Sequence, residues 1–252
     1  MKTITLSLLL LTTFQVYALS RTEADSLAAQ GTRAYAAGEV KTALALFDSA
    51  NTAFTSPALL YNIGNCHFKL NDIPHAILFY ERALRLAPGD ADVRTNLELA
   101  RQNVVDRVNE LPSFSLGTTW SRIRGGRDAD QWARRALWAC LLTFTVLGVA
   151  VLLRQRSLRR VLFGISGMLF LGTVLSVAFA AYRHTELTDE SDAIIMSAKV
   201  DVRSEPRDGS TVLFVLHKGT KVTVLQQDNA WSEVRLANGS VGWMPPATLE
   251  RI

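Results

Sequence analysis

The pattern of apolar and polar positions divides the chain into segments of different kinds. Residues 6–16, 136–153 and 161–182 are largely apolar. Within residues 19–110, apolar and small side chains recur at the spacing of amphipathic helices, whereas after residue 190 apolar and polar positions alternate. These periods predict helices first and short strands last. We therefore expect a multidomain protein with an all-α array, a hairpin of two apolar helices and an all-β domain at residues 191–252.

The first apolar segment has the features of a secretory signal peptide at residues 1–18. Lys2 supplies a short positive region, the apolar part is about eleven residues long, and Val16 and Ala18 occupy the −3 and −1 positions of a cleavage site. A span of the bilayer needs ~20 residues. We therefore expect cleavage after Ala18, with an uncleaved anchor as the alternative.

The two longer apolar segments, 136–153 and 161–182, contain no charged residue. Their lengths fit transmembrane helices, which need roughly 17–25 residues. Two buried core helices are the alternative, but no soluble domain of this chain is large enough to hide them. Residues 154–160 contain four arginines, which is typical of a cytoplasmic loop between two spans.

The signal peptide and the arginine loop together predict the topology. Both soluble segments would lie on the periplasmic side of the bacterial inner membrane. Arginines at residues 122–135 and at Arg183 make a simple count of flanking charges ambiguous. Residues 111–135 also contain Trp120 and Trp132, so we expect an amphipathic linker on the membrane surface, with a solvated linker as the alternative. A second linker is expected at residues 183–190.

An internal repeat is visible between residues 24 and 90. Small residues recur 33 positions apart, and Tyr80 repeats Phe47 at the same offset. The better copy reads LLYNIGNCHFKLNDIPHAILFYERALRLAPGD, at residues 59–90. Each copy predicts two antiparallel helices that cross at the small residues, and residues 91–100 predict a further, capping helix. Gly38 and Asn71 fall in the interhelix turns, where a left-handed backbone is expected.

This segment resembles the tetratricopeptide (TPR) repeat. The residues that match its signature are Gly31, Ala43, Ala50, Gly64, Ala76, Tyr80, Ala83 and Pro88. The resemblance implies a protein-binding groove lined by the first helix of each unit. The candidate groove residues are Tyr61, Asn62, Asn65, Lys69 and Asn96. Alternatively, the asparagines satisfy a hydrogen-bond network between the repeats.

The C-terminal segment predicts six short strands and an Asn238-Gly239 hairpin turn. The strands are expected at residues 193–196, 199–203, 211–216, 220–225, 231–236 and 241–244. So many strands in about 60 residues suggest a closed or nearly closed barrel.

Residues 200–206, 217–225 and 239–244, together with Trp231, resemble a bacterial SH3 domain. The resemblance implies binding of peptides or of cell-wall peptidoglycan. The candidate surface residues are Trp231, Trp243 and Pro245. Alternatively, the tryptophans have a structural packing role.

Charge and composition exclude several other functions. The net charge is +4, but both soluble segments are slightly acidic and the basic surplus flanks the apolar segments, so we expect no nucleic-acid binding. Cys66 lies in a helix and Cys140 in the membrane, so they should not pair. His67 and His75 have no acidic or histidine partner at ligand spacing, which predicts no metal site. No catalytic or cofactor-binding motif is present, so we expect neither enzymatic activity nor a cofactor.

The order of these modules resembles that of the BatE-type proteins of the Bacteroides aerotolerance operon. That resemblance implies a scaffold that acts beside membrane-anchored von Willebrand factor A-domain proteins and a MoxR-type ATPase. The leading expectation is a membrane-anchored scaffold of the bacterial envelope. A cell-wall sensor that binds peptidoglycan through the SH3 domain is the alternative.

Overall fold

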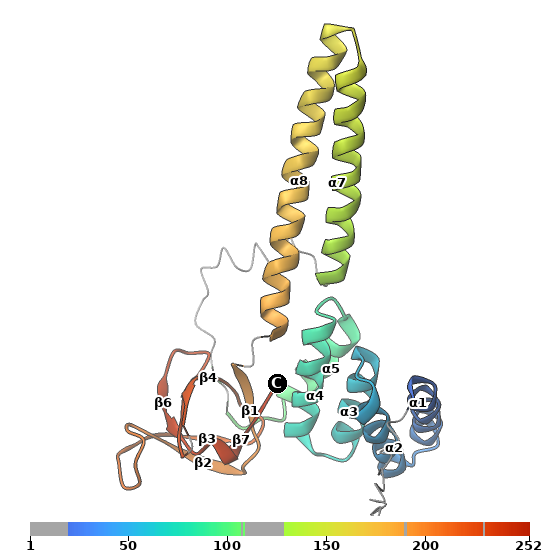
Figure 1. Ribbon diagram of the computed structural model, residues 1–252. Helices are drawn as coiled ribbons and strands as arrows, with labels where there is room; N and C mark the ends of the chain where they lie inside the picture. Colours follow the sequence, from blue (N-terminus) through green and yellow to red (C-terminus); the bar gives the residue numbers. More distant parts are fainter. Residues whose placement is uncertain (1–19, 107, 109–128, 189–190, 229) are drawn as a thin grey trace, which may run out of the picture.

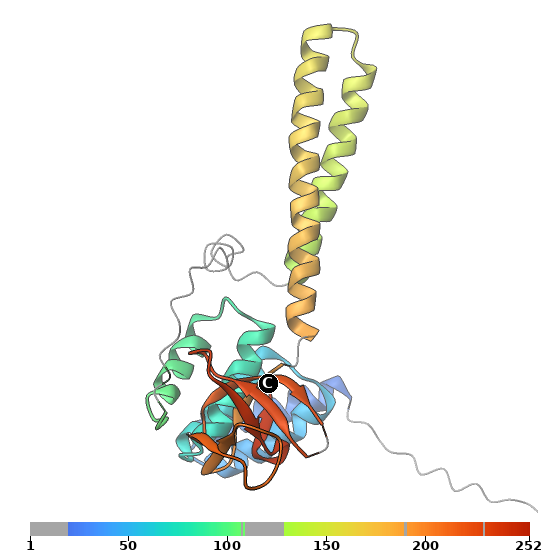
Figure 2. The ribbon, with the colours of Figure 1, turned by 90° about the vertical axis from the view of Figure 1, so that its left-hand side faces the viewer.

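The computed structural model describes residues 20–106, 108, 129–188, 191–228 and 230–252. The helical array and the sheet lie side by side at the base of a long hairpin of two helices (Figures 1 and 2). The expected signal peptide, most of the first linker and the end of the second lie outside the described residues.

The helical array consists of two helix pairs and a fifth helix, as expected. Its elements are α1 (Arg21–Ala36), α2 (Val40–Ala53), α3 (Pro57–Lys69), α4 (Ile73–Leu86) and α5 (Ala91–Arg101). Side-chain hydrogen bonds cap the N-termini of three of these helices. Ser20 and Glu23 form a capping box at α1, Ser56 accepts from the Leu59 N–H at α3, and Asp90 caps α5.

The small residues of the repeat sit where two helices of a pair approach each other closely. A Cβ atom added to Gly31 would lie 2.7 Å from the Phe47 ring, and one added to Gly64 would lie 2.6 Å from the Tyr80 ring. Both rings are buried. The same glycine–ring contact therefore occurs once in each helix pair, and this explains why the small residues recur 33 positions apart. The turns also follow the prediction, because Asn71 has φ 61°.

The hairpin consists of α7 (Ala129–Leu152) and α8 (Arg156–Thr188). Both helices are long and apolar enough to cross a membrane, and only 17% and 6% of their most apolar windows are buried. Core helices of a soluble protein would be mostly buried, so the membrane interpretation is favoured. Trp138, for example, is 71% exposed, as a lipid-facing side chain would be.

The helices of the hairpin are longer than the apolar segments on which they were predicted. α7 begins at Ala129 and therefore includes the end of the linker expected at residues 111–135. Trp132 is buried against Phe179 of α8, with ring centroids 4.7 Å apart, so it packs between the helices. α8 begins at Arg156, which leaves a connection shorter than the loop expected at residues 154–160.

The C-terminal domain is one antiparallel sheet with the strand order β3-β2-β6-β5-β4-β1-β7. Its elements are β1 (Asp192–Ile195), β2 (Lys199–Arg203), β3 (Val212–His217), β4 (Lys221–Gln227), β5 (Ser232–Arg235), β6 (Val241–Met244), a 3-10 turn (Pro246–Thr248) and β7 (Leu249–Arg251). All six expected strands are present. β7 was missed because three residues are too few to show alternation. β3 and β7 form the edges, so the sheet is open and only loosely resembles the closed or nearly closed barrel we expected.

The helical array and the sheet share a hydrophobic core. Consecutive residues of β1 point to opposite faces: Ile195 lies in the core of the sheet domain, whereas Ile194 belongs to the core of the array. Both side chains are fully buried. The residues of the array in the cluster with Ile194 include Leu60, Ile77, Tyr80, Val93 and Leu97. The two domains are therefore joined by packing as well as by the chain.

Candidate binding surfaces

Three of the five predicted groove residues form one hydrogen-bond network. The Oδ1 atom of Asn65 accepts from the Tyr80 hydroxyl at 2.7 Å and from the Asn96 Nδ2 at 2.9 Å. The same Nδ2 donates to the Tyr61 hydroxyl at 3.0 Å. This network links α3, α4 and α5. It supports the alternative we considered, in which the asparagines stabilise the array.

The remaining two groove residues lie near the network on α3. Lys69 places its ammonium 4.5 Å from the centroid of the Tyr35 ring, a cation–π contact between α3 and α1. Asn62 is half-buried. Cys66, also on α3, is fully buried, and burial raises the pKa of its thiol to about 11. The cysteine is therefore a packing residue, as predicted, and both cysteines are free.

The three predicted SH3 surface residues lie in or next to the paired strands β5 and β6. In the β5–β6 pair, Glu233 lies opposite Trp243 and Ser232 lies opposite Met244. Directly opposed residues share a face, and alternate residues along a strand also share it. Trp243 therefore points away from the core that holds Met244. Trp231 and Pro245 lie one residue beyond β5 and β6, and we expect the same alternation to place them on this face. All three are half-buried, which leaves part of each side chain available to a ligand.

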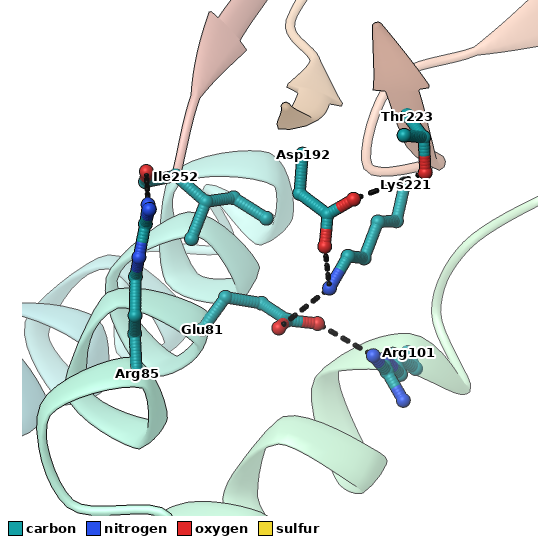
Figure 3. A network of polar contacts seen from close by, with 7 residues as sticks. All are labelled: Glu81, Arg85, Arg101, Asp192, Lys221, Thr223 and Ile252. Atoms are coloured by element: carbon teal, nitrogen blue, oxygen red, sulfur yellow. Dashed lines mark hydrogen bonds and ion pairs between the residues drawn. The ribbon is translucent and has the colours of Figure 1, made fainter. Parts of the chain in front are cut away.

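An ionic network joins the helical array to the sheet (Figure 3). Lys221 of β4 contacts Glu81 of α4 at 3.1 Å and Asp192 of β1 at 2.9 Å. Arg101 of α5 binds the second oxygen of Glu81 at 2.5 Å, and Thr223 donates to Asp192 at 3.0 Å. Burial by itself lowers the pKa of Lys221, but the two carboxylates outweigh it and raise the pKa. The lysine is therefore charged. We call this interface between the helical array and the sheet, around Ile194 and Lys221, the joint.

The end of the chain extends this joint. Arg82 contacts Glu250 at 3.1 Å and donates to the Arg251 carbonyl at 2.6 Å. Arg85 donates to the Ile252 carbonyl (Figure 3). Arg183, near the end of α8, donates to the Arg85 carbonyl. The C-terminal end of α4 therefore contacts both the sheet and the hairpin.

A second polar cluster connects the segment that follows α5 to the sheet. The Asp106 carboxylate accepts from the His217 backbone N–H at 2.6 Å and from the Thr220 hydroxyl at 2.7 Å, and it contacts the His217 Nδ1 at 2.8 Å. Burial raises the pKa of Asp106, but these hydrogen bonds outweigh burial and the net effect lowers it. Sequence reasoning missed the joint, because the polar partners that the sheet and the array contribute to it, such as Lys221 with Glu81 and His217 with Asp106, are more than 100 residues apart and no motif connects them.

His67 and His75 do have an acidic partner, contrary to our expectation. The His67 Nδ1 lies 3.1 Å from the Asp72 carboxylate, and the His75 Nδ1 lies 2.8 Å from it. The prediction was wrong because it overlooked Asp72, which precedes His75 by three residues at the start of α4, a spacing that makes two side chains neighbours. His67 lies in the last turn of α3, Asp72 follows the turn at Asn71, and His75 lies in the first turn of α4, so the reversal of the chain brings His67 to the other two.

Comparisons with known families agree with the two modules. Residues 57–90, which contain α3 and α4, match the tetratricopeptide repeat family. Residues 198–250, which contain β2 to β7, match the bacterial SH3 domain family. A comparison with curated proteins found no match. Domains of both kinds typically bind other molecules rather than catalyse reactions, so the chain combines two binding modules with two apolar helices.

Proposed function

We propose that the protein is a non-enzymatic, membrane-anchored adaptor of the bacterial envelope. Its TPR and SH3 modules would lie on the periplasmic side of the inner membrane and assemble a Bat-type complex. The joint around Ile194 and Lys221 supports this proposal most strongly. Because the modules share a core and an ionic network, they present their surfaces in one fixed arrangement at the base of the hairpin.

A fixed arrangement favours simultaneous binding of two partners, or of two sites on one partner. Tethering raises the effective concentration for the second contact, so weak individual contacts give stable recruitment. Rigid presentation also reduces the entropy lost on binding. The proposed partners are envelope proteins with von Willebrand factor A domains.

Affinity purification of the full-length protein from its native membrane in mild detergent, followed by mass spectrometry, tests the adaptor. We expect recovery of proteins with von Willebrand factor A domains. A Trp231→Ala/Trp243→Ala variant should lose partners held by the sheet face. Trp138→Ala, which changes an exposed tryptophan of the hairpin, is the matched control. Recovery of no envelope protein with the wild type would contradict the proposal.

Peptidoglycan binding is the second candidate function. The shared face of Trp231, Trp243 and Pro245 favours it, because aromatic rings suit both sugar rings and peptide stems. Purified sacculi should sediment the full-length protein, and Trp231→Ala should reduce the bound fraction while Trp138→Ala should not. Equal sedimentation of both variants would exclude this surface as the wall-binding site.

A further inference from the structure

The cluster of His67, Asp72 and His75 has the ligand composition of a transition-metal site. One carboxylate oxygen of Asp72 lies 3.1 Å from the His67 Nδ1 and 2.8 Å from the His75 Nδ1. One donor atom from each residue can be chosen so that all three lie within 4.8 Å of one another. Two imidazoles and one carboxylate are donors that zinc binds readily in proteins.

The separations between Asp72 and the two histidines are close to those around a shared ion. Zinc binds imidazole nitrogen at about 2.0–2.1 Å and carboxylate oxygen at about 2.0–2.2 Å, so adjacent tetrahedral ligands lie roughly 3.4 Å apart. The observed oxygen–nitrogen separations of 2.8 and 3.1 Å are slightly shorter. Rotation of the Asp72 carboxylate away from the imidazoles, together with turning of the His75 ring out of its stack on His67, would admit the ion and leave a fourth position for water or a partner's side chain.

The fold holds the three side chains in this arrangement. The His67 ring stacks on the His75 ring, with centroids 5.0 Å apart and an interplanar angle of 20°, and on the Phe79 ring, at 5.4 Å and 8°. Asp72 is the N-cap residue of α4, yet its side chain makes no capping hydrogen bond and contacts the two histidines instead. The N-terminus of α4 therefore has no side-chain cap, because the Asp72 carboxylate points at the imidazoles instead.

The cluster is accessible to an ion from solution. The side chains of His67, Asp72 and His75 are 14%, 38% and 40% exposed. The His67 side chain, which stacks on Phe79, is the least exposed of the three, and partial shielding of a donor from water strengthens its binding of a charged ion. Asp48 of α2 interacts electrostatically with His67 and adds a further negative charge nearby.

We propose that His67, Asp72 and His75 form a zinc site that fixes the turn between α3 and α4. The site lies at the end of α4 away from Arg85, and so away from the contacts of that helix with the hairpin. A bound ion would cross-link the two helices of the second repeat. This site does not depend on the proposed adaptor function, since it needs neither the sheet face nor a protein partner.

Titration calorimetry of Zn²⁺ into the full-length protein tests the site. The protein should be purified in detergent without a histidine tag and treated with a chelator. We expect one ion per chain. His75→Gln and Asp72→Asn should each weaken binding by at least the roughly 10–100-fold that follows loss of an outer-shell partner. His217→Gln, which changes another aspartate-paired histidine, is the matched control and should bind like the wild type.

Thermal melting provides a second measurement. Zn²⁺ should raise the melting temperature of the wild type and of His217→Gln, but not that of His75→Gln, because a ligand of the folded state stabilises it. Melting in chelator shows whether each variant folds. The proposal is overturned if the wild type does not bind Zn²⁺, or if folded His75→Gln and Asp72→Asn bind it as tightly as the wild type does. It is also overturned if His217→Gln loses as much affinity for Zn²⁺ as these two variants.

Discussion

Shortening Ile194 to alanine should loosen the joint between the helical array and the sheet. Ile194 is fully buried and belongs to the core of the array, although it lies on β1 of the sheet. Its neighbour Ile195 is equally buried but belongs to the core of the sheet domain. The same substitution at these two positions therefore removes the same atoms from two different cores.

The expected magnitude follows from the atoms removed. Ile→Ala deletes three carbon atoms, each worth about 0.8 kcal/mol of transfer free energy, and leaves a cavity that raises the total to roughly 2–5 kcal/mol. For Ile194→Ala this cost falls on docking of the domains. At about 1.4 kcal/mol per factor of ten, a loss of ~3 kcal/mol weakens docking about a hundredfold.

Hydrogen exchange of the full-length protein in detergent measures this loss segment by segment. Ile194→Ala should increase exchange in α4 and β1 by up to about a hundredfold while the central strands β5 and β6 stay protected. Ile195→Ala should instead increase exchange across the sheet. If Ile194→Ala left α4 unchanged, or if both variants gave the same pattern, the two domains would not share a core as argued.

Three further predictions concern other contacts. Gly64→Ala should destabilise the array by about 1–3 kcal/mol in thermal unfolding, because its Cβ would lie 2.6 Å from the buried Tyr80 ring, whereas Gly148→Ala, with no atom within 4 Å, should not. Lys221→Met should lower the free energy of unfolding by about 1–2 kcal/mol, because Glu81 loses an ionic partner. The loss is modest because the lysine side chain is 35% exposed, and no change in melting temperature would contradict this. The pKa of Asp106 is lower in the folded than in the unfolded protein. Its contribution to the free energy of unfolding is therefore complete at pH values above the ordinary carboxyl pKa and is lost as the pH falls through the pKa of the folded state. Asp106→Asn should reduce this acid dependence, and an unchanged pH profile of unfolding would contradict it.

The sequence was most informative where contacts are local and periodic. Gly64 and Tyr80 are 16 residues apart, and the same pair recurs at Gly31 and Phe47, so the repeat itself reveals the helix crossing. The six expected strands were found because alternation over four or more residues reflects one buried and one exposed face. β7 lacked that length and was missed.

Contacts between distant segments could not be predicted in the same way. Glu81 and Lys221 are 140 residues apart, and each looks like an ordinary surface charge in its own element. Ile194 looks like one of several apolar residues in a strand, and its sequence position does not show that it packs in another domain. The histidine cluster was closer in sequence. Asp72 and His75 are three residues apart at the start of α4, which is a helical spacing, whereas His67 joins them only because the chain turns at Asn71.

The shared core changes how the two modules should be separated in experiments. Removing residues 19–110 would expose Ile194 and leave Lys221 without Glu81, so loss of a partner after that deletion could reflect a damaged sheet. Conversely, an isolated array would expose part of the surface that covers Ile194, and two repeats with one capping helix are already a minimal array. We therefore expect a lower melting temperature for the 19–110 fragment than for the array within the full chain. Substitutions on the sheet face, such as Trp231→Ala, leave the joint intact and so test binding without this ambiguity.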